Sequence, residues 1–259
     1  MHVVVCVKQI PDPAEPGSLD PSTKTLKRDQ KLILDEADSY GVEMALQLVD
    51  AAGGGSVSLV SMAPNGETAG LRTALAMGAA DAILVSDPAL QGTDALGTAR
   101  VLAAAIGRST PDLVLTATES SDGYTGTVPM QVAELLGLPA VTFAKSVKVE
   151  GSSVAIQRQT EDGYDDVVCP LPAVVSVTAG VVEPRYPSFK GIMAAKSKPV
   201  EELTVADLGI AADQVGWAGG GQEIVEISAA EARQAGRVVE DEGEAFGEIV
   251  AFLENLKII

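Results

Sequence analysis

The residues best suited to bind a charged ligand lie between 116 and 128, directly after an apolar run that predicts a buried strand. Gly123 and Gly126 permit close approach of the backbone. A helix is predicted to begin at Thr127, and the free N–H groups at a helix start attract anions. The segment therefore predicts a phosphate site that needs no lysine or arginine, with hydroxyls from Thr116, Thr118, Ser120, Ser121, Thr125 and Thr127. The same composition is also typical of a capping loop without a ligand.

Residues that could carry acid–base, nucleophilic or metal chemistry are scarce. The only histidine is His2, so a Ser-His-Asp mechanism would have a single possible base. Cys6 and Cys169 both lie inside apolar runs, which is typical of buried thiols. No Gly-x-Gly-x-x-Gly or Walker motif is present. The sequence therefore predicts no catalytic residue and no metal site.

The elements that must position the hydroxyl-rich segment alternate between strand and helix. Apolar runs predict strands at 3–7, 57–60, 82–85 and 113–117. Helical spacing of apolar residues predicts helices at 38–49, 68–77, 93–106 and 127–136. This order predicts an α/β fold with a doubly wound, mostly parallel sheet and helices on both faces. Ligands of such sheets bind outside the carboxyl ends of the strands, which is where the segment lies.

The pattern changes after residue 139. An antiparallel excursion is predicted from a turn at 161–164 and short strands at 140–144, 147–149, 154–158 and 167–169. The apolar run 172–178 again predicts a buried central strand. Residues 1–199 are therefore predicted to form the nucleotide-binding domain. Residues 200–259 are predicted to form an acidic C-terminal arm packed on another chain, with a helix at 240–256; a partly disordered tail is the alternative.

Charge is uneven along this acidic chain, whose formal net charge is −18. An acidic protein is a poor nucleic-acid binder. Residues 201–259 contain 13 acidic and 3 basic residues, whereas residues 183–198 contain 1 acidic and 4 basic ones. Such a basic island could steer an acidic partner. No run of 18 apolar residues predicts a membrane span, and the N-terminus resembles a strand more than a signal peptide, so a cytoplasmic location is expected.

A second segment of unusual chemistry spans residues 181–198. Pro184 and Pro187 remove backbone donors, which keeps the segment out of a central sheet. The apolar side chains of Phe189, Ile192 and Met193 lie among several lysines. A rigid basic loop with an apolar tip predicts a docking surface for another protein.

This segment resembles the signature of the β subunit of electron transfer flavoproteins. The matching residues are Glu183-Pro-Arg-Tyr186, followed by Ile192-Met-Ala-Ala-Lys-Ser-Lys198. The stretch from Leu71 to Val85, Leu-Arg-Thr-Ala-Leu-Ala-Met-Gly-Ala-Ala-Asp-Ala-Ile-Leu-Val, resembles the same family. The resemblance extends from Val3 to about Gly209, which is most of the chain.

The resemblance implies that the hydroxyl-rich loop binds an AMP with a structural role, while FAD is held mainly by an α subunit. The family's nucleotide-binding positions correspond here to Cys6, Asp35, Glu36, Ala37, Asp38 and Met62. They also correspond to the run Ala117, Thr118, Glu119, Ser120, Ser121, Asp122, Gly123, Tyr124, Thr125, Gly126, Thr127 and Val128.

The resemblance also implies that the second segment anchors partner dehydrogenases through one apolar side chain, which is Phe189 here. The implied partner-binding residues are Arg185, Tyr186, Phe189, Lys190, Ile192 and Met193. The implied function is that of a heterodimer subunit. The complex would accept electrons from acyl-CoA dehydrogenases of fatty acid β-oxidation and pass them to a membrane quinone oxidoreductase, and this chain would perform no bond chemistry.

Two alternatives stay open. One is an electron-bifurcating subunit with its own FAD and NAD site. Bifurcating members usually have Asp-Gly-Asp-Thr where this chain has Asp122-Gly-Tyr-Thr125, and the missing acid favours AMP. Non-bifurcating members usually have an Asn/Gln/Thr-type segment at Gly126-Thr-Val128, so the chain matches neither pattern fully. The other alternative is a stand-alone nucleotide-binding α/β protein, which would have no evident use for the acidic arm.

Overall fold

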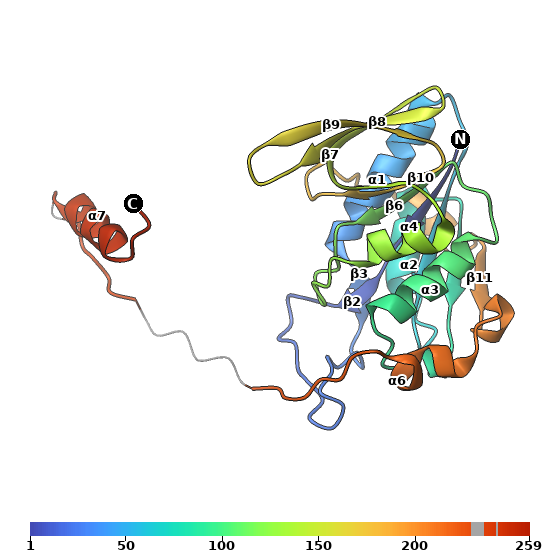
Figure 1. Cartoon of the computed structure of the whole chain (residues 1–259), viewed down its shortest axis with the longest axis horizontal. Coiled ribbons are helices and arrows are strands. Elements are labelled where there is room, and N and C mark those ends of the chain that lie inside the picture. The colour runs from blue at the N-terminus through green and yellow to red at the C-terminus, as the bar shows by residue number, and fades with distance from the viewer. Residues whose placement is uncertain (229–235, 242) are drawn as a thin grey trace. The chain divides into compact units, whose positions relative to one another are not determined.

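The computed structural model describes residues 1–228, 236–241 and 243–259. Within this part the chain forms a nine-stranded sheet in the order β11-β5-β4-β1-β6-β10-β7-β8-β9 (Figure 1). The strands from β11 to β7 run parallel, and β8 and β9 continue the sheet antiparallel. The strand bounds are β1 His2–Cys6, β4 Ser56–Met62, β5 Asp81–Val85, β6 Leu113–Ala117, β7 Ala140–Glu150, β8 Ser153–Gln159, β9 Tyr164–Pro170, β10 Ala173–Val177 and β11 Val200–Leu203. The predicted fold class is confirmed.

Helices cover both faces of the sheet, each over its own apolar core. Helices α1 (Glu36–Ala51) and α2 (Ala69–Met77) pack on one core. Helices α3 (Ala95–Ile106) and α4 (Val128–Leu136) pack on the other. The central strand β1 is buried on both sides, because Val3, Val4 and Val5 are at most 1% exposed and alternate between the two cores. This arrangement explains why β1 is a continuous apolar run.

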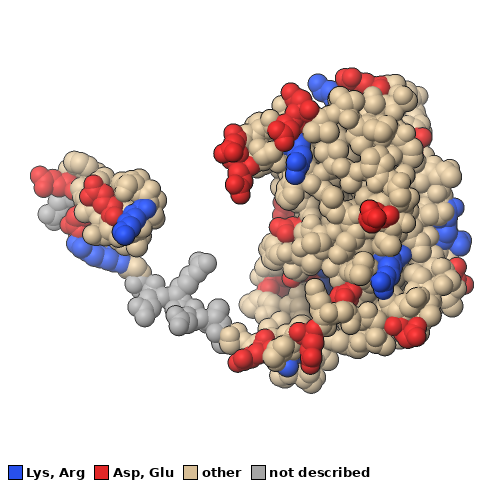
Figure 2. Space-filling model, viewed as in Figure 1, with Lys and Arg blue, Asp and Glu red and all other residues tan. Residues whose placement is uncertain are grey.

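The hairpins that end the sheet differ in one detail from the prediction. Strand β7 is continuous where two short strands were expected, and its register against β8 shifts between Ala144 and Ser146. Phe143 has a φ of 60° beside this shift. A β-bulge therefore replaces the expected break. Acidic side chains gather at the free end of the β8–β9 hairpin in Figure 2, where Glu161, Asp162, Asp165 and Asp166 are exposed.

A small sheet that was not predicted lies beside the main one. Strands β2 (Gln9–Pro11) and β3 (Leu32–Leu34) pair antiparallel, and each is too short to give a periodic signal. The buried Gln9 side chain accepts a hydrogen bond from Gly70 N at 2.9 Å, at the start of α2. A Cβ on Gly70 would lie 2.6 Å from Leu34 N, so only glycine allows this approach.

The compact α/β unit extends further along the chain than the expected boundary at residue 199. It comprises Met1–Ile224, and Val225–Ile259 forms a second unit. Strand β11 pairs with β5, so the first residues of the expected arm belong to the sheet. Short helical turns follow in the first unit: η2 Ala206–Leu208, η3 Ala212–Gln214 and α6 Gly216–Gly219, with η1 Pro88–Leu90 before α3.

The second unit contains helix α7 (Ala245–Asn255), which lies inside the predicted range 240–256. Residues 229–235 and 242, which also belong to the expected acidic arm, lie outside the described residues. In the described part of the chain no helix is long and apolar enough to cross a membrane.

Candidate functional site

The main cavity lies where the chain reverses its direction across the sheet. Strand β1 lies between β4 and β6, so the chain moves outward in both directions from it. The carboxyl ends of these three strands contribute Cys6, Met62 and Ala117 to a cavity of about 800 Å³. Ligands of open α/β sheets bind at this kind of switch point, and the volume lies within the ordinary range for small-ligand sites.

Many of the predicted nucleotide-binding residues line this cavity. They are Cys6, Asp38, Met62, Ala117, Thr118, Glu119, Ser120, Thr125, Gly126 and Val128. The other predicted positions do not line it: Asp35, Glu36, Ala37, Ser121, Asp122, Gly123, Tyr124 and Thr127. Topology thus brings together residues from four separate parts of the sequence. Their binding of a nucleotide stays a prediction.

Asp35 fastens the hydroxyl-rich loop to the start of α1. Its carboxylate accepts hydrogen bonds from Ser121 N and Ser121 Oγ, both at 2.8 Å, and from Ala37 N at 3.1 Å. The Asp35 side chain is fully buried. It therefore serves as the N-cap of α1 and as an anchor for the loop. The predicted segments 35–38 and 117–128 are thus in contact through Asp35 and Ser121, although these two residues do not line the cavity.

The loop ends at a helix start whose N–H groups lack a side-chain cap. Tyr124 (φ 49°) and Gly126 (φ 68°) turn the backbone, and the Tyr124 side chain is exposed. Thr127 occupies the N-cap of α4 but makes no capping bond, and Pro129 lies in the first turn. Unpaired N–H groups and the helix dipole favour an anion here.

A second polar group lies beside the same cavity. The Thr116 hydroxyl is buried, and among the described residues it has no hydrogen-bond partner. Thr116 lies at the end of β6 and lines the cavity. Buried hydroxyls are nearly always paired, so the Thr116 hydroxyl is an exception at the wall of this cavity.

Sequence reasoning missed three cations that line the cavity, Lys8, Lys27 and Arg28. Lys8 Nζ lies 2.7 Å from Asp122 Oδ1, and Arg28 pairs with the other oxygen of the same carboxylate. Burial alone would raise the pKa of Asp122, but the two cations outweigh it and hold the pKa below its ordinary value. Lys8 directly follows the first predicted strand, which could have placed it at this edge. Arg28 lies in a long connection without any periodic signal.

Two further groups at the cavity favour their neutral forms. Burial, with repulsion from Asp35 as the next cause, raises the pKa of Asp38 well above its ordinary value. Asp38 Oδ2 accepts a hydrogen bond from Lys8 N at 2.6 Å. Burial, followed by the charge of Asp38, raises the pKa of the Cys6 thiol to about 12. Cys6 is therefore an unreactive thiol.

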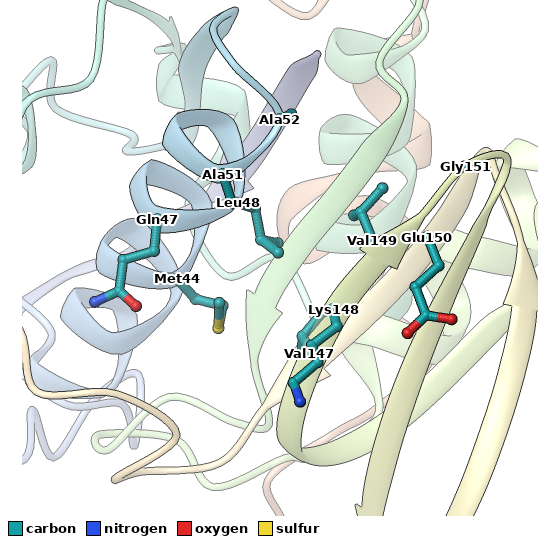
Figure 3. A pocket seen from close by; sticks show the side chains of 10 residues that line it. All are labelled: Met44, Gln47, Leu48, Ala51, Ala52, Val147, Lys148, Val149, Glu150 and Gly151. Atoms are coloured by element: carbon teal, nitrogen blue, oxygen red, sulfur yellow. The ribbon is translucent and has the colours of Figure 1, made fainter.

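A second cavity, of about 560 Å³, lies between α1 and β7 and carries none of the predicted site residues (Figure 3). Its walls are mostly apolar, with Met44 and Leu48 on the helix and Val147 and Val149 on the strand. The residue types suited to phosphate binding are concentrated instead in the cavity at the strand ends.

The predicted docking segment forms a short helix, α5 (Phe189–Ala195), fixed on α2. Ser188 caps its start, and Arg72 Nη1 donates to Ala195 O at 2.7 Å at its end. A Cβ on Gly191 would lie 2.4 Å from Ala76 O, so glycine permits the close contact of the two helices. The backbone of the segment is therefore held firmly.

The outer side of this segment is apolar. Tyr186 and Phe189 are 94% and 80% exposed, and Ile192 and Met193 are also exposed, as is Lys190. Two of the four cations of the basic island bind their own chain. Arg185 forms a two-pronged ion pair with the buried Glu43, with distances of 2.6 and 3.1 Å, and Lys198 Nζ donates to Ala79 O at 2.6 Å. The ion pair, together with Gln47, holds the pKa of Glu43 below its ordinary value although burial opposes this.

The fold and the cavity define an open α/β protein with a ligand site at the topological switch point of its sheet. The model of the electron transfer flavoprotein domain matches residues 23–208. The chain therefore belongs to the electron transfer flavoprotein family, as a β subunit.

Several relatives carry the name of this subunit. The electron transfer flavoprotein subunit beta of Mycobacterium bovis is 40% identical over all of this chain and 99% of its own length. The subunit of Megasphaera elsdenii is 36% identical over 94% of both chains. The caffeyl-CoA reductase–Etf complex subunit CarD of Acetobacterium woodii is 33% identical over the whole of both chains. The predicted family is thus confirmed, which makes this chain an electron carrier subunit with an α subunit as partner.

Proposed function

We propose that the α subunit carries the redox FAD and that this chain supports it, holds a structural AMP and docks acyl-CoA dehydrogenases. Electrons then pass to a membrane quinone oxidoreductase, and the complex works in the cytoplasm. Apart from docking and binding, this chain contributes no chemistry to the transfer. Its single histidine, His2, lies at the opposite end of β1 from the cavity, bonded to Ser58 Oγ at 3.1 Å.

The observation that carries the AMP assignment is the chemistry of the cavity wall. The uncapped start of α4 and the cations Lys8 and Arg28 meet at one cavity. Each of these groups suits a phosphate-bearing ligand. When bound, AMP would supply no redox chemistry, and its role would be to join the loop, α1 and the strand ends.

A second candidate is a FAD in the same cavity. Its support is the 33% identity to a subunit named for a caffeyl-CoA reductase–Etf complex, together with the cavity volume of about 800 Å³. Against it stands Tyr124, which replaces the acid of the bifurcating pattern and is exposed.

The docking role is supported by the contrast within α5. Arg72 of α2 donates a hydrogen bond to Ala195 O at the end of α5, while Phe189 projects into solvent. A large apolar side chain on a rigid frame costs little entropy when it enters a partner's pocket. Arg185, which was predicted to contact the partner, is bound to Glu43 and is proposed to orient the loop.

The test is a count of bound cofactors. A tagged form of this chain is purified with its partner, the complex is denatured, and the released nucleotides are quantified by chromatography. One FAD and one AMP per heterodimer supports the proposal. Two FAD per heterodimer supports the second candidate. A chain without a flavin-bearing partner would contradict both and favour a stand-alone binding protein.

A further inference from the structure

Two of the three cations at the cavity, Lys8 and Arg28, share one carboxylate, that of Asp122. Lys8 and Arg28 line the cavity with side chains that are 41% and 34% exposed, whereas Asp122 does not line it and its side chain is 5% exposed. Asp122 therefore lies behind the two cations as seen from the cavity. One carboxylate balances only one of the two positive charges, so Lys8, Arg28 and Asp122 together keep one positive charge.

Both cations keep hydrogen-bond donors for a ligand. Lys8 Nζ has three donors and uses two, toward Asp122 and, at 3.1 Å, toward Ser120 Oγ. The Arg28 guanidinium has five N–H groups and bonds Asp122 and the Gln9 carbonyl. These charged donors make stronger hydrogen bonds to phosphate than amides or hydroxyls do.

The ammonium group of Lys8 also lies within the hydroxyl-rich loop. A Cβ on Gly123 would lie 3.7 Å from Lys8 Nζ, 3.8 Å from Thr125 Oγ1 and 3.2 Å from Ser120 Oγ. The cation and the loop hydroxyls thus surround one small region, close in sequence to the uncapped start of α4. This juxtaposition brings together a full positive charge and several neutral donors.

We propose that Lys8 and Arg28 bind the phosphate of the nucleotide and that Asp122 fixes both cations instead of contacting the ligand. The inference rests on the proposed nucleotide site and changes the sequence expectation of a phosphate site without lysine or arginine. The physical reason is charge. The chain has a net charge of −18, so an anionic ligand needs cations nearby. Five acidic residues also line the cavity: Asp20, Asp29, Asp38, Asp94 and Glu119.

The test compares two ligands that differ only in the phosphate. The full chain in complex with its α subunit, freed of bound nucleotide, is titrated with AMP and with adenosine by calorimetry. The ratio of the two dissociation constants isolates the contribution of the phosphate. In Lys8→Ala and Arg28→Ala, AMP binding is expected to weaken by ~10- to 100-fold while adenosine binding changes little.

Matched variants separate this role from a structural one. Lys31 lies in the same connection as Arg28 but does not line the cavity. Lys31→Ala should therefore leave the ratio of the AMP and adenosine dissociation constants unchanged. Asp122→Asn should lower the preference for AMP by ~2- to 10-fold, since the cations lose their fixed positions. An equal loss of AMP and adenosine binding in the Lys8 and Arg28 variants, or an unchanged ratio, would overturn the proposal. If the unmodified complex bound neither ligand, the nucleotide site itself would be wrong, which is a distinct result.

Discussion

The cavity proposed to hold a nucleotide and helix α5, proposed as a docking site, use charged and apolar residues in opposite ways. At the cavity, the polar group Lys8 Nζ keeps one hydrogen-bond donor unused, while the Tyr124 side chain is exposed and does not line the cavity. Near α5, the cations Arg72 and Lys198 donate hydrogen bonds to backbone carbonyls of Ala195 and Ala79, and Phe189 is exposed. The comparison teaches that a ligand site is recognised by polar groups with unused hydrogen-bonding capacity. A docking site is recognised by exposed apolar side chains on a backbone whose hydrogen bonds are already made.

The largest effect is expected at the docking helix. Phe189→Ala removes the most prominent apolar side chain of α5, and a central anchor contributes ~2 kcal/mol or more, so the rate of reduction by the dehydrogenase at low concentration should fall by ~30-fold. Nucleotide content and heterodimer formation should not change. Val168→Ala, which shortens an exposed residue on β9, is the control for a general loss of apolar surface. Unchanged reduction kinetics in Phe189→Ala would remove the anchor assignment.

The reverse pattern is expected at the cavity. The double variant Asp122→Ala with Thr125→Val disturbs the cation cluster and removes a loop hydroxyl, so nucleotide affinity should fall by ~10-fold or more. Docking at α5 should be unaffected. Chromatography of the nucleotide released from the purified complex measures this effect, and full occupancy would place the site elsewhere.

A third prediction concerns stability and pH. Because the pKa of Asp38 is raised, mainly by burial, its contribution to stability is full below its unfolded pKa and is lost as the pH rises toward the folded pKa. Asp38→Asn cannot ionise and still offers an oxygen to Lys8 N. It should raise the free energy of unfolding at pH 7 by ~0.5–2 kcal/mol, with the gain shrinking toward pH ~4.

Asp122→Asn provides the matched control for this pH effect. The cations outweigh burial and lower the pKa of Asp122, so its contribution is present above its unfolded pKa and is lost as the pH falls through the folded pKa. This variant should therefore be less stable at pH 7, opposite in sign to Asp38→Asn. Thermal unfolding of both variants across pH 4–8 measures the difference, and the same sign for both would contradict the assigned pKa directions.

The smallest effect is expected from salt. In the basic island, Arg185 and Lys198 bind groups of their own chain, which leaves the exposed Lys190 and Lys196 to attract a partner. Long-range steering of an acidic dehydrogenase should therefore be modest. Raising ionic strength from ~0.05 to ~0.3 M should slow the partner reaction a few-fold. Lys190→Ala should flatten this dependence, and stopped-flow rates at several salt concentrations measure it. A rate that rises with salt would exclude steering by these lysines.

The sequence predicted the elements that have strong local signals. The apolar run at 3–7 and the helical spacing at 38–49 each correspond to an observed element, β1 and α1. Weak local signals failed. Strands β2 and β3 have three residues each, and the continuous β7 contains a bulge that the sequence presents as a break. Strand β11 was missed because it carries two glutamates at the edge of the sheet.

By itself the sequence determined the fold class and the family, and it led to the two segments proposed to carry function, because alternation of strand and helix and short motifs are local properties of the chain. Only the tertiary structure decided what each charged residue does. Lys8, Arg28 and Asp122 are far apart in sequence and meet because β1, the β2–β3 connection and the loop after β6 reach one edge of the sheet. From the sequence, Arg185 was predicted to contact a partner, whereas in the folded chain it pairs with Glu43. A charge acts through the partners within a few ångströms of it, and that distance is fixed only when the chain has folded.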